Sequence, residues 1–254
     1  MRALILAAGQ GTRLRPLTDH IPKPLVMFKG TPLLEIIIKR LLNAGMEKII
    51  VNVHHMADQV VEFLRSREYY QNRVLVSDET DRIMDTGGGV LKASELLNNG
   101  EPFLVHNVDV YTNLDIPKLI HSHQSDNALI TIAVKKRATS RSLLFDNNNR
   151  LTGWQHNQTG EKKIIRDYSG DLIDYGNSCV YIFNPEFFGL VQTRDPVSLT
   201  DIYLALAKDH KINGYVHNQD YWYNLGLYDA FLKAEDDVKN SDLLEFENLA
   251  KVPE

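Results

Sequence analysis

The sequence predicts an α/β protein with a mostly parallel central sheet. In the first half of its 254 residues, short apolar runs of strand length alternate with longer stretches of helical periodicity. Such alternation is typical of βαβ units, whose strands lie parallel. In addition, a glycine-containing loop follows the first apolar run, which is where open α/β sheets bind their ligands.

The elements of the first half follow from these runs and their boundaries. Thr31 as N-cap and Pro32 as first helical residue predict a helix that continues to residue 43 and stops at Gly45. The same criteria predict strands at 3–8, 48–52, 73–77, 102–107 and 129–134, and helices at 58–65, 89–97 and 116–124.

The second half has a different character. The asparagines at 147–149 predict a hairpin turn within 143–151, since asparagine tolerates left-handed backbone. The polar stretch 155–173 is interpreted as a flap. A strand at 175–183, a short helix opened by Pro185, and helices at 199–208 and 228–239 follow. We expect a single domain over 1–254, with halves 1–135 and 136–240 and a C-terminal tail at 241–254.

Composition narrows the function classes. A net charge of −5 argues against nucleic acid or an anionic membrane as the main partner. No apolar run reaches the roughly 18 residues that suggest a membrane span, and Met1 leads straight into the first strand without a secretory leader. Cys179 is the single cysteine, which rules out an internal disulfide and fits an inert buried residue and a cytoplasmic location.

The most informative segment is residues 1–24. Gly9 and Gly11 allow the backbone to turn tightly, and exposed N–H groups there can form an anion-binding nest. Arg13, Arg15 and Lys23 add positive charge suited to phosphates. The segment has neither the Walker A pattern nor the third glycine of the dinucleotide fingerprint. It therefore predicts a phosphate-binding loop of another type.

Three further motifs contain residues that could bind a ligand or a metal ion. Residues 85–90 place three glycines at a helix start, where a base or sugar could lie against bare backbone, or where a flexible turn is needed. Asp109 ends an apolar strand, which suits a Mg²⁺ ligand beside phosphates, or a helix cap. Asn224 lies between aromatic residues at 221–226, as a second metal ligand or as a turn residue.

These four segments, in this order, resemble the sugar-1-phosphate nucleotidyltransferases across nearly the whole chain. The resemblance is closest to short members such as the N-acetylmuramate-1-phosphate uridylyltransferases and mannose-1-phosphate guanylyltransferases. It implies a three-layer Rossmann-like, glycosyltransferase-A-like fold, with a nucleotide-binding half at 1–135 and a sugar-phosphate-binding half at 136–240. The implied reaction joins a sugar 1-phosphate to a nucleoside triphosphate with Mg²⁺, in a monomer or homodimer.

The resemblance also implies roles for individual residues. Arg13, Lys23 and Asp109 would be catalytic, and Asp109 and Asn224 would hold the metal. The nucleotide would contact Leu6, Ala7, Ala8, Gly9, Gly11, Thr12, Arg13, Asp78, Glu79, Thr86, Gly87 and Gly88. The sugar phosphate would contact Asn107, Lys162, Asn177 and Asn224, with Lys163 as an alternative to Lys162.

Three features depart from the family pattern. One is the polar stretch 160–163, which contains Lys162 and Lys163 and has no clear counterpart in the closest members. The other two are single positions. The family usually has glycine before the metal aspartate, where this chain has Val108, and aspartate where it has Asn224. An asparagine offers Mg²⁺ a carbonyl oxygen but no charge, so Asp220 is an alternative ligand. These departures leave two other functions open. One is a non-catalytic nucleotide or nucleotide-sugar binder. The other is a transferase for an alcohol phosphate such as phosphocholine, with an aromatic box from Tyr175, Tyr221, Trp222 and Tyr223.

Overall fold

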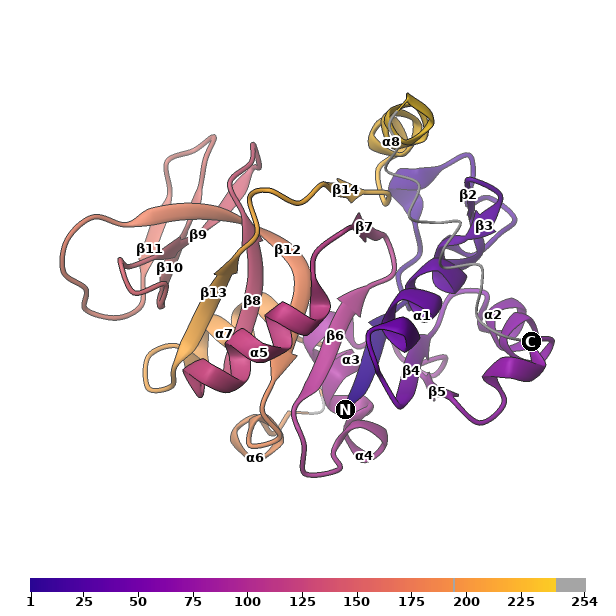
Figure 1. The fold of residues 1–254 in the computed structure, drawn as a ribbon, viewed down its shortest axis with the longest axis horizontal. Helices are drawn as coiled ribbons and strands as arrows, with labels where there is room; N and C mark the ends of the chain where they lie inside the picture. Colours follow the sequence, from indigo (N-terminus) through magenta and orange to yellow (C-terminus); the bar gives the residue numbers. More distant parts are fainter. Residues whose placement is uncertain (194, 241–254) are drawn as a thin grey trace.

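A large mixed sheet organises the molecule (Figure 1). The computed structural model describes residues 1–193 and 195–240. Its strands run in the order β5-β4-β1-β6-β12, and beyond β12 the sheet divides into a β8-β13 branch and a β9-β10-β11 branch. The strands of this sheet are β1 (Arg2–Leu6), β4 (Lys48–Val53), β5 (Val74–Asp78), β6 (Phe103–Asn107), β8 (Ile130–Lys135), β9 (Arg141–Phe145), β10 (Leu151–His156), β11 (Lys162–Ile164), β12 (Ile173–Phe183) and β13 (Ile212–Val216).

The strands β1, β4, β5 and β6 are parallel, as the alternation in the sequence predicted. Their register aligns Leu6 with Asn52 of β4 and with Asn107 of β6, and Asn52 in turn with Ser77 of β5. The carboxyl ends of these four strands therefore form one row at the same edge of the sheet.

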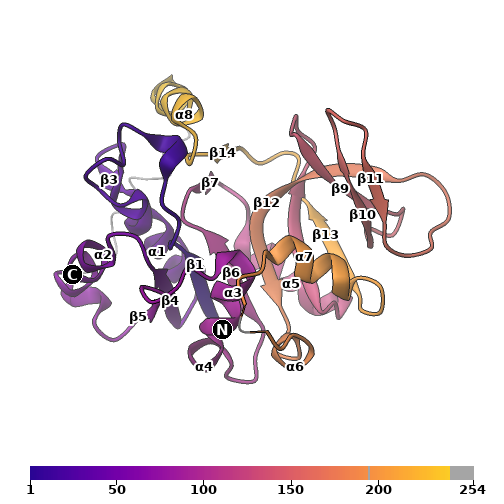
Figure 2. The ribbon, with the colours of Figure 1, turned by 180° about the vertical axis from the view of Figure 1, so that it is seen from behind.

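Helices cover both faces of the sheet and complete the predicted three layers. Successive residues of a strand point to opposite faces, so Ala3 and Ile5 of β1 join one core cluster while Leu4 and Leu6 join the other. Residues of α1 (Leu33–Asn43), α2 (Ala57–Arg65), α5 (Ile116–Asp126) and α8 (Tyr228–Asn240) belong to the first cluster. Figure 2 shows the opposite face, covered by α3 (Asp85–Lys92), α4 (Ser94–Leu97), α6 (Phe187–Leu190) and α7 (Leu199–Leu206).

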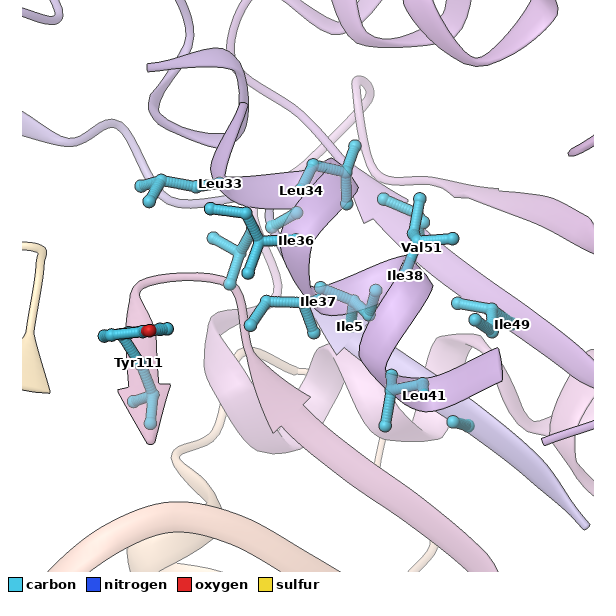
Figure 3. Close-up of a cluster of buried hydrophobic side chains, with 14 of the residues drawn as sticks. Ile5, Leu33, Leu34, Ile36, Ile37, Ile38, Leu41, Ile49, Val51 and Tyr111 are labelled. Atoms are coloured by element: carbon cyan, nitrogen blue, oxygen red, sulfur yellow. The ribbon is translucent and has the colours of Figure 1, made fainter. Parts of the chain in front are cut away.

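Helix α1 is held in this core by its apolar side chains. Its side chains pack over β1 and β4, with Ile37 and Ile38 near Ile5, Ile49 and Val51 (Figure 3). Fully burying each such side chain contributes about 1.5–3 kcal/mol. The predicted start differs by one residue, because Thr31 and Pro32 form β3 against β2 (Met27–Phe28) and Pro32 is the N-cap.

Several elements differ from the sequence-based predictions. The helix predicted at 89–97 begins at Asp85 and is broken into α3 and α4. The strands β7 (Val110–Thr112) and β14 (Trp222–Asn224), which form a separate two-stranded antiparallel sheet, and the edge strand β13 lack long apolar runs. They were not predicted as strands, apart from the strand-like aromatic segment at 221–226. Three short 3-10 helices, η1 (Thr12–Leu14), η2 (Lys23–Leu25) and η3 (Glu68–Tyr70), complete the described elements.

The predicted divisions of the chain map onto this sheet as follows. The boundary at 135 falls at the end of β8, and strands from both halves pair within one sheet. The predicted flap at 155–173 contains the end of β10 and the exposed strand β11, which pairs with β10. The predicted tail at 241–254 lies outside the described residues. None of the helices formed by the described residues combines the length and hydropathy that a bilayer-spanning helix needs.

Candidate functional site

The loop after β1 presents unused backbone donors. Gly11 adopts a left-handed conformation with φ of 68°, and its carbonyl accepts a hydrogen bond of 2.8 Å from the buried Thr18 hydroxyl. Leu14 of η1 is fully buried and anchors the loop to the core. Within the described chain, no hydrogen bond uses the N–H groups of Gly9, Gln10 or Gly11. The loop thus has the free donors that an anion-binding nest requires.

Lys23 and Arg13 supply positive charge at this loop in different ways. The Lys23 ammonium lies 3.4 Å from the position that a Cβ on Gly9 would occupy, and 3.1 Å from Asp109 Oδ2. Arg13 is exposed and makes no hydrogen bond or ion pair with the described residues. Arg15 instead lies 3.4 Å from Asp19 in a solvent-exposed pair. Arg13 therefore keeps its guanidinium available for a ligand.

Asn52, which sequence analysis did not identify, fixes the start of the loop. Its Oδ1 accepts hydrogen bonds from the Ala7 and Ala8 N–H groups at 2.5 and 3.2 Å, and its Nδ2 donates to Glu79 Oε1 at 2.7 Å. Glu79 is fully buried, and burial raises the pKa of its carboxyl. Asn52 is a polar residue near the end of an apolar strand, and that position could have indicated it.

A cavity of about 130 Å³ lies at the row of strand ends. Sequence analysis had assigned seven of its residues to the site, and the other three are Asn52, Ile83 and Asp85. Its lining consists of Leu6, Ala8, Gly9, Lys23, Asn52, Glu79, Ile83, Asp85, Thr86 and Asn107. The cavity thus joins the phosphate loop to the turn before α3.

Several predicted nucleotide contacts lie elsewhere. Ala7, Gly11, Thr12 and Arg13 belong to the same loop but do not line this cavity. Asp78 is exposed and accepts a hydrogen bond of 2.8 Å from the Thr80 N–H, and hydrogen bonds from Thr80 lower the pKa of its carboxyl.

Gly87 and Gly88, the first two glycines of α3, use their N–H groups in hydrogen bonds within the protein, and their contact with the base stays a prediction. Both glycine N–H groups donate to the Val197 carbonyl, at 2.8 and 3.1 Å. A Cβ on Gly87 would lie 2.8 Å from that oxygen, and one on Gly89 would lie 2.8 Å from Asn52 Nδ2. The glycines therefore permit close packing of α3 against the segment before α7 and against Asn52.

The two-stranded β7–β14 sheet brings the two predicted metal ligands together. Asn224 pairs with Val110, and the Leu225 N–H donates to the Asp109 carbonyl at 2.7 Å. A Cβ on Gly226 would overlap Asp109 Oδ2 and lie 3.1 Å from Asn224 Oδ1, so both oxygens border the same small space. Val108 points into the core and is 1% exposed, so it leaves this space open.

These oxygens fit a Mg²⁺ ion that takes its remaining ligands from phosphates and water. The described residues contain no cluster of three acidic, histidine or cysteine side chains that could enclose a metal by themselves. Asp220 does not join the pair, because its carboxylate lies 3.3 Å from His217 Nδ1 and the register places Asn224 beside Asp109.

A second cavity, of about 530 Å³, lies between the β9–β11 branch, β12 and α7. Lys163 lines it and Lys162 does not, because adjacent strand residues point to opposite faces; the contact of either lysine with the sugar phosphate stays a prediction. The lining is Arg141, Ser142, Leu143, Trp154, Lys163, Ile165, Asn177, Ser198, Thr200, Asp201, Tyr203, Leu204, Ala205 and Lys208.

The two cavities share a wall. The Thr86 hydroxyl accepts a hydrogen bond of 2.9 Å from the Leu199 N–H. Thr86 lines the smaller cavity, and Ser198 and Thr200, on either side of Leu199, line the larger one. The contact between Thr86 and Leu199 therefore lies between the two cavities.

Asn177 borders the larger cavity and shapes β12. Its Oδ1 accepts from the Cys179 N–H at 2.8 Å, and its Nδ2 donates to the Tyr181 hydroxyl at 2.9 Å. Cys179 has a positive φ of 57°, at an irregularity in the β12–β8 register. Burial raises the pKa of its thiol to about 11, which agrees with the inert role predicted for it.

A Ser–His–Asp arrangement, in which the serine and the histidine are buried, lies next to the β7–β14 sheet and was not predicted. His217 Nε2 lies 2.7 Å from Ser178 Oγ, and Trp222 Nε1 donates to the Ser178 carbonyl at 3.0 Å. Ser178 is fully buried, so it cannot reach a substrate as a nucleophile. The arrangement instead ties β12 to the segment that carries Asn224.

The four aromatic residues considered as a quaternary-ammonium box are dispersed. Tyr175 packs on Phe145, while the Arg137 guanidinium covers the Trp222 ring at 4.0 Å. Tyr221 and Tyr223 pack around Tyr111 at the two-stranded β7–β14 sheet. These side chains pack against other residues of the fold and do not form one box.

Comparisons with known proteins show the family of the chain. The family described as Nucleotidyl transferase matches residues 2–241. An N-acetylmuramate alpha-1-phosphate uridylyltransferase of Caulobacter vibrioides is 32% identical over 245 residues, covering 92% of this chain and 95% of the relative. Mannose-1-phosphate guanyltransferase beta-A of Xenopus laevis is 28% identical over 237 residues, which are 91% of this chain and 63% of that protein.

Solved structures show the same fold. HddC from Yersinia pseudotuberculosis superposes with a TM-score of 0.75 at 22% identity, over 93% of this chain and 99% of that one. Its complex with GMP-PN gives a TM-score of 0.74. With the family match and the full-length relatives, the chain belongs to the nucleotidyl transferase family, and within it to the sugar-1-phosphate nucleotidyltransferases.

Proposed function

We propose that this chain transfers the nucleotidyl group of a nucleoside triphosphate to a sugar 1-phosphate, with the triphosphate at the small cavity and the acceptor in the large one. A phosphate oxygen of the acceptor forms a bond to the α-phosphorus. The bond from the α-phosphorus to the bridging oxygen of the β-phosphate breaks, and pyrophosphate leaves with that electron pair. The attacking oxygen is already anionic, so the step needs no general base.

The observation that carries this proposal is the convergence at the strand ends of free loop N–H groups, Lys23 and Asp109 beside the cavity. Two polyanions repel each other, so a catalyst must position them in line and neutralise their charge. The loop N–H groups and Lys23 hold phosphate oxygens, and the unpaired guanidinium of Arg13 reaches charge that develops at the α-phosphorus.

Asp109 and Asn224 would hold Mg²⁺, which would neutralise phosphate charge when bound. Lys23 lies within hydrogen-bond distance of Asp109 and keeps this carboxylate oriented toward the loop. The one-carboxylate site carries less negative charge than a two-carboxylate site, and we expect it to require a higher Mg²⁺ concentration.

The test is release of pyrophosphate with Mg²⁺, each of the four common nucleoside triphosphates and a panel of sugar 1-phosphates. We expect turnover with at least one pair, and a loss of at least about 100-fold in Arg13→Ala. Arg15→Ala is the matched control, because its guanidinium pairs with Asp19 at the surface. Full activity in Arg13→Ala would contradict the assignment of that residue.

The same assay separates the alternative functions. Tight nucleotide-sugar binding without turnover across the panel would identify a non-catalytic binder. Turnover of phosphocholine in place of the sugar phosphates would identify an alcohol-phosphate transferase, which the dispersed aromatic residues do not favour.

A further inference from the structure

Arg137, two residues beyond β8, carries a partly buried positive charge that no carboxylate of the described residues neutralises. Its guanidinium donates hydrogen bonds to the neutral carbonyl oxygens of Asn177, at 2.9 Å, and of Ala138, at 3.4 Å. Its Nε is buried and has no hydrogen-bond partner within the described chain. Burial lowers the pKa of this guanidinium. A charge that is taken out of water without an opposite charge is costly, so this arrangement favours an anionic ligand.

The guanidinium of Arg137 is held in one place by its surroundings. Its central carbon lies 4.0 Å from the centroid of the Trp222 ring, and this ring is itself fixed by a hydrogen bond of 3.0 Å from Nε1 to the Ser178 carbonyl. Gly176 leaves the room that the guanidinium occupies, because a Cβ on Gly176 would lie 2.8 Å from Arg137 Cζ. Arg137 is therefore a preorganised cation, which loses little side-chain freedom when it binds an anion.

Arg137 lies between the larger cavity and the two predicted metal ligands. Asn177, whose carbonyl accepts its hydrogen bond, lines the larger cavity. Trp222, on which the guanidinium packs, is two residues from Asn224 on β14. Residues two apart on a strand point to the same face and are separated by about 7 Å. The guanidinium thus borders the face of β14 that carries Asn224.

The charged groups of the phosphate loop lie near the same point. Burial raises the pKa of the Cys179 thiol, Asp109 raises it further, and Arg137 and Lys23 lower it. Because such effects act between nearby charges, all three side chains lie around this one thiol. Arg137 therefore belongs to the group of charges at the strand ends, although it comes from a different part of the chain.

A sugar 1-phosphate in the larger cavity must bring its phosphate toward Asp109 and the triphosphate, and this path leads past Arg137. We propose that Arg137 binds the phosphate of the acceptor and aligns its attacking oxygen with the α-phosphorus. A guanidinium suits this task, because its N–H groups can hold two phosphate oxygens while the third is left to attack. This inference rests on the proposed function and adds a residue to its acceptor site.

Arg137→Met tests the proposal, since it removes the charge and keeps an unbranched side chain beside Trp222. We expect the KM for the sugar 1-phosphate to rise about tenfold or more and the KM for the nucleoside triphosphate to change less than about twofold. Arg137→Lys should give an intermediate KM, because an ammonium keeps the charge without the planar fork. Lys136→Met is the matched control, since this exposed neighbour pairs with Asp174 at 2.5 Å.

Gly176→Ala tests the same contact without removing the charge. The added Cβ would displace the guanidinium, and the flexible end of Arg137 can move without disturbing the backbone. We expect a similar rise in the KM for the sugar 1-phosphate and no further rise when Gly176→Ala is combined with Arg137→Met, because both changes remove one contact. Wild-type KM values in both single variants would overturn the proposal.

Calorimetric titration with the panel of sugar 1-phosphates and with inorganic phosphate gives a readout that does not depend on turnover. If no pair of substrates reacts but these probes bind less tightly to Arg137→Met than to the wild type, the assignment of Arg137 stands and the proposed reaction fails. If the reaction proceeds and Arg137→Met raises only the KM for the triphosphate, the assignment fails and the proposed reaction stands. Equal binding and equal kinetics of the wild type and Arg137→Met with every probe would overturn the assignment whatever the outcome for the reaction.

Discussion

Gly226 is the residue whose missing side chain defines the space between Asp109 and Asn224. A Cβ there would overlap Asp109 Oδ2. We predict that Gly226→Ala displaces this carboxylate and lowers kcat at least about tenfold, because a metal site tolerates little misplacement of its ligands. The requirement for Mg²⁺ should rise as well, which a titration of activity against Mg²⁺ measures.

Gly189→Ala is the control for this substitution, since a Cβ on Gly189 meets nothing within 4 Å. Both variants should keep the thermal midpoint of the wild type within a few degrees. Wild-type activity and Mg²⁺ dependence in Gly226→Ala would contradict the assignment of Asp109 and Asn224 to one metal site.

Asn224 leads to a second prediction at this scale. Replacing it by aspartate adds a charge beside Asp109 without changing the shape of the side chain. We expect Asn224→Asp to bind Mn²⁺, used as a spectroscopic probe for Mg²⁺, about tenfold more tightly. Electron paramagnetic resonance of free Mn²⁺ measures this, and Asn218→Asp, outside the β7–β14 sheet, is the control. Unchanged affinity would remove Asn224 from the ligand set.

Residue types at strand ends were predictable and residue pairings were not. Asp109 and Lys23 could be identified from their motifs, and the structure brings them to 3.1 Å. Asn52 was missed because its role depends on two neighbouring strands. The choice between Lys162 and Lys163 depended on which face of β11 points to the cavity, which requires the register.

At the scale of elements, the Asn52 side chain links three parts of the sheet edge. It joins the loop after β1, its own strand β4 and Glu79 beyond β5. We predict that Asn52→Ala lowers the free energy of unfolding by about 2–4 kcal/mol, since Glu79 and two backbone N–H groups lose their buried partner. It should also raise KM for the nucleoside triphosphate, because the loop loses its anchor.

Urea unfolding and steady-state kinetics measure these two effects. Asn99→Ala, at an exposed position, should change neither. A destabilised Asn52→Ala with unchanged KM would show that the asparagine stabilises the fold without positioning the loop.

The strands with long apolar runs were predicted well because burial on both faces requires such runs. Short elements such as β7, β11 and β13 lack this signal, and only their partners make them strands. The three glycines of α3 were predicted as a ligand surface, since the sequence alone does not reveal which backbone approaches them.

At the scale of the whole molecule, the buried histidines His106 and His217 make the free energy of unfolding depend on pH. Burial lowers the pKa of His106 to about 4, and burial also lowers the pKa of His217 to about 4 against the opposing effect of Asp220. The unfolded chain has histidine pKa values near 6.5, so unfolding takes up protons below that pH. The free energy of unfolding should therefore fall as the pH drops from about 6.5 to about 4.

The predicted loss is of the order of 3 kcal/mol per histidine across this window. The raised pKa of Glu79 opposes it in part, because protonation of that carboxyl favours the folded state. Urea unfolding followed by tryptophan fluorescence between pH 8 and pH 4.5 measures the slope. His217→Gln should be less stable at pH 8 and show a flatter pH dependence; an unchanged slope would contradict the role of this histidine.

The sheet divides at β12, and substitutions on the two sides of this strand affect different parts of the candidate site. The row of strand ends on one side carries the phosphate loop, whereas the β9–β11 branch begins only beyond β12 and supplies much of the larger cavity. Replacing side chains on that outer branch leaves the phosphate chemistry in place. On the proposed function, substitutions in the β9–β11 branch would therefore change which sugar is accepted without changing the loop that holds the phosphates.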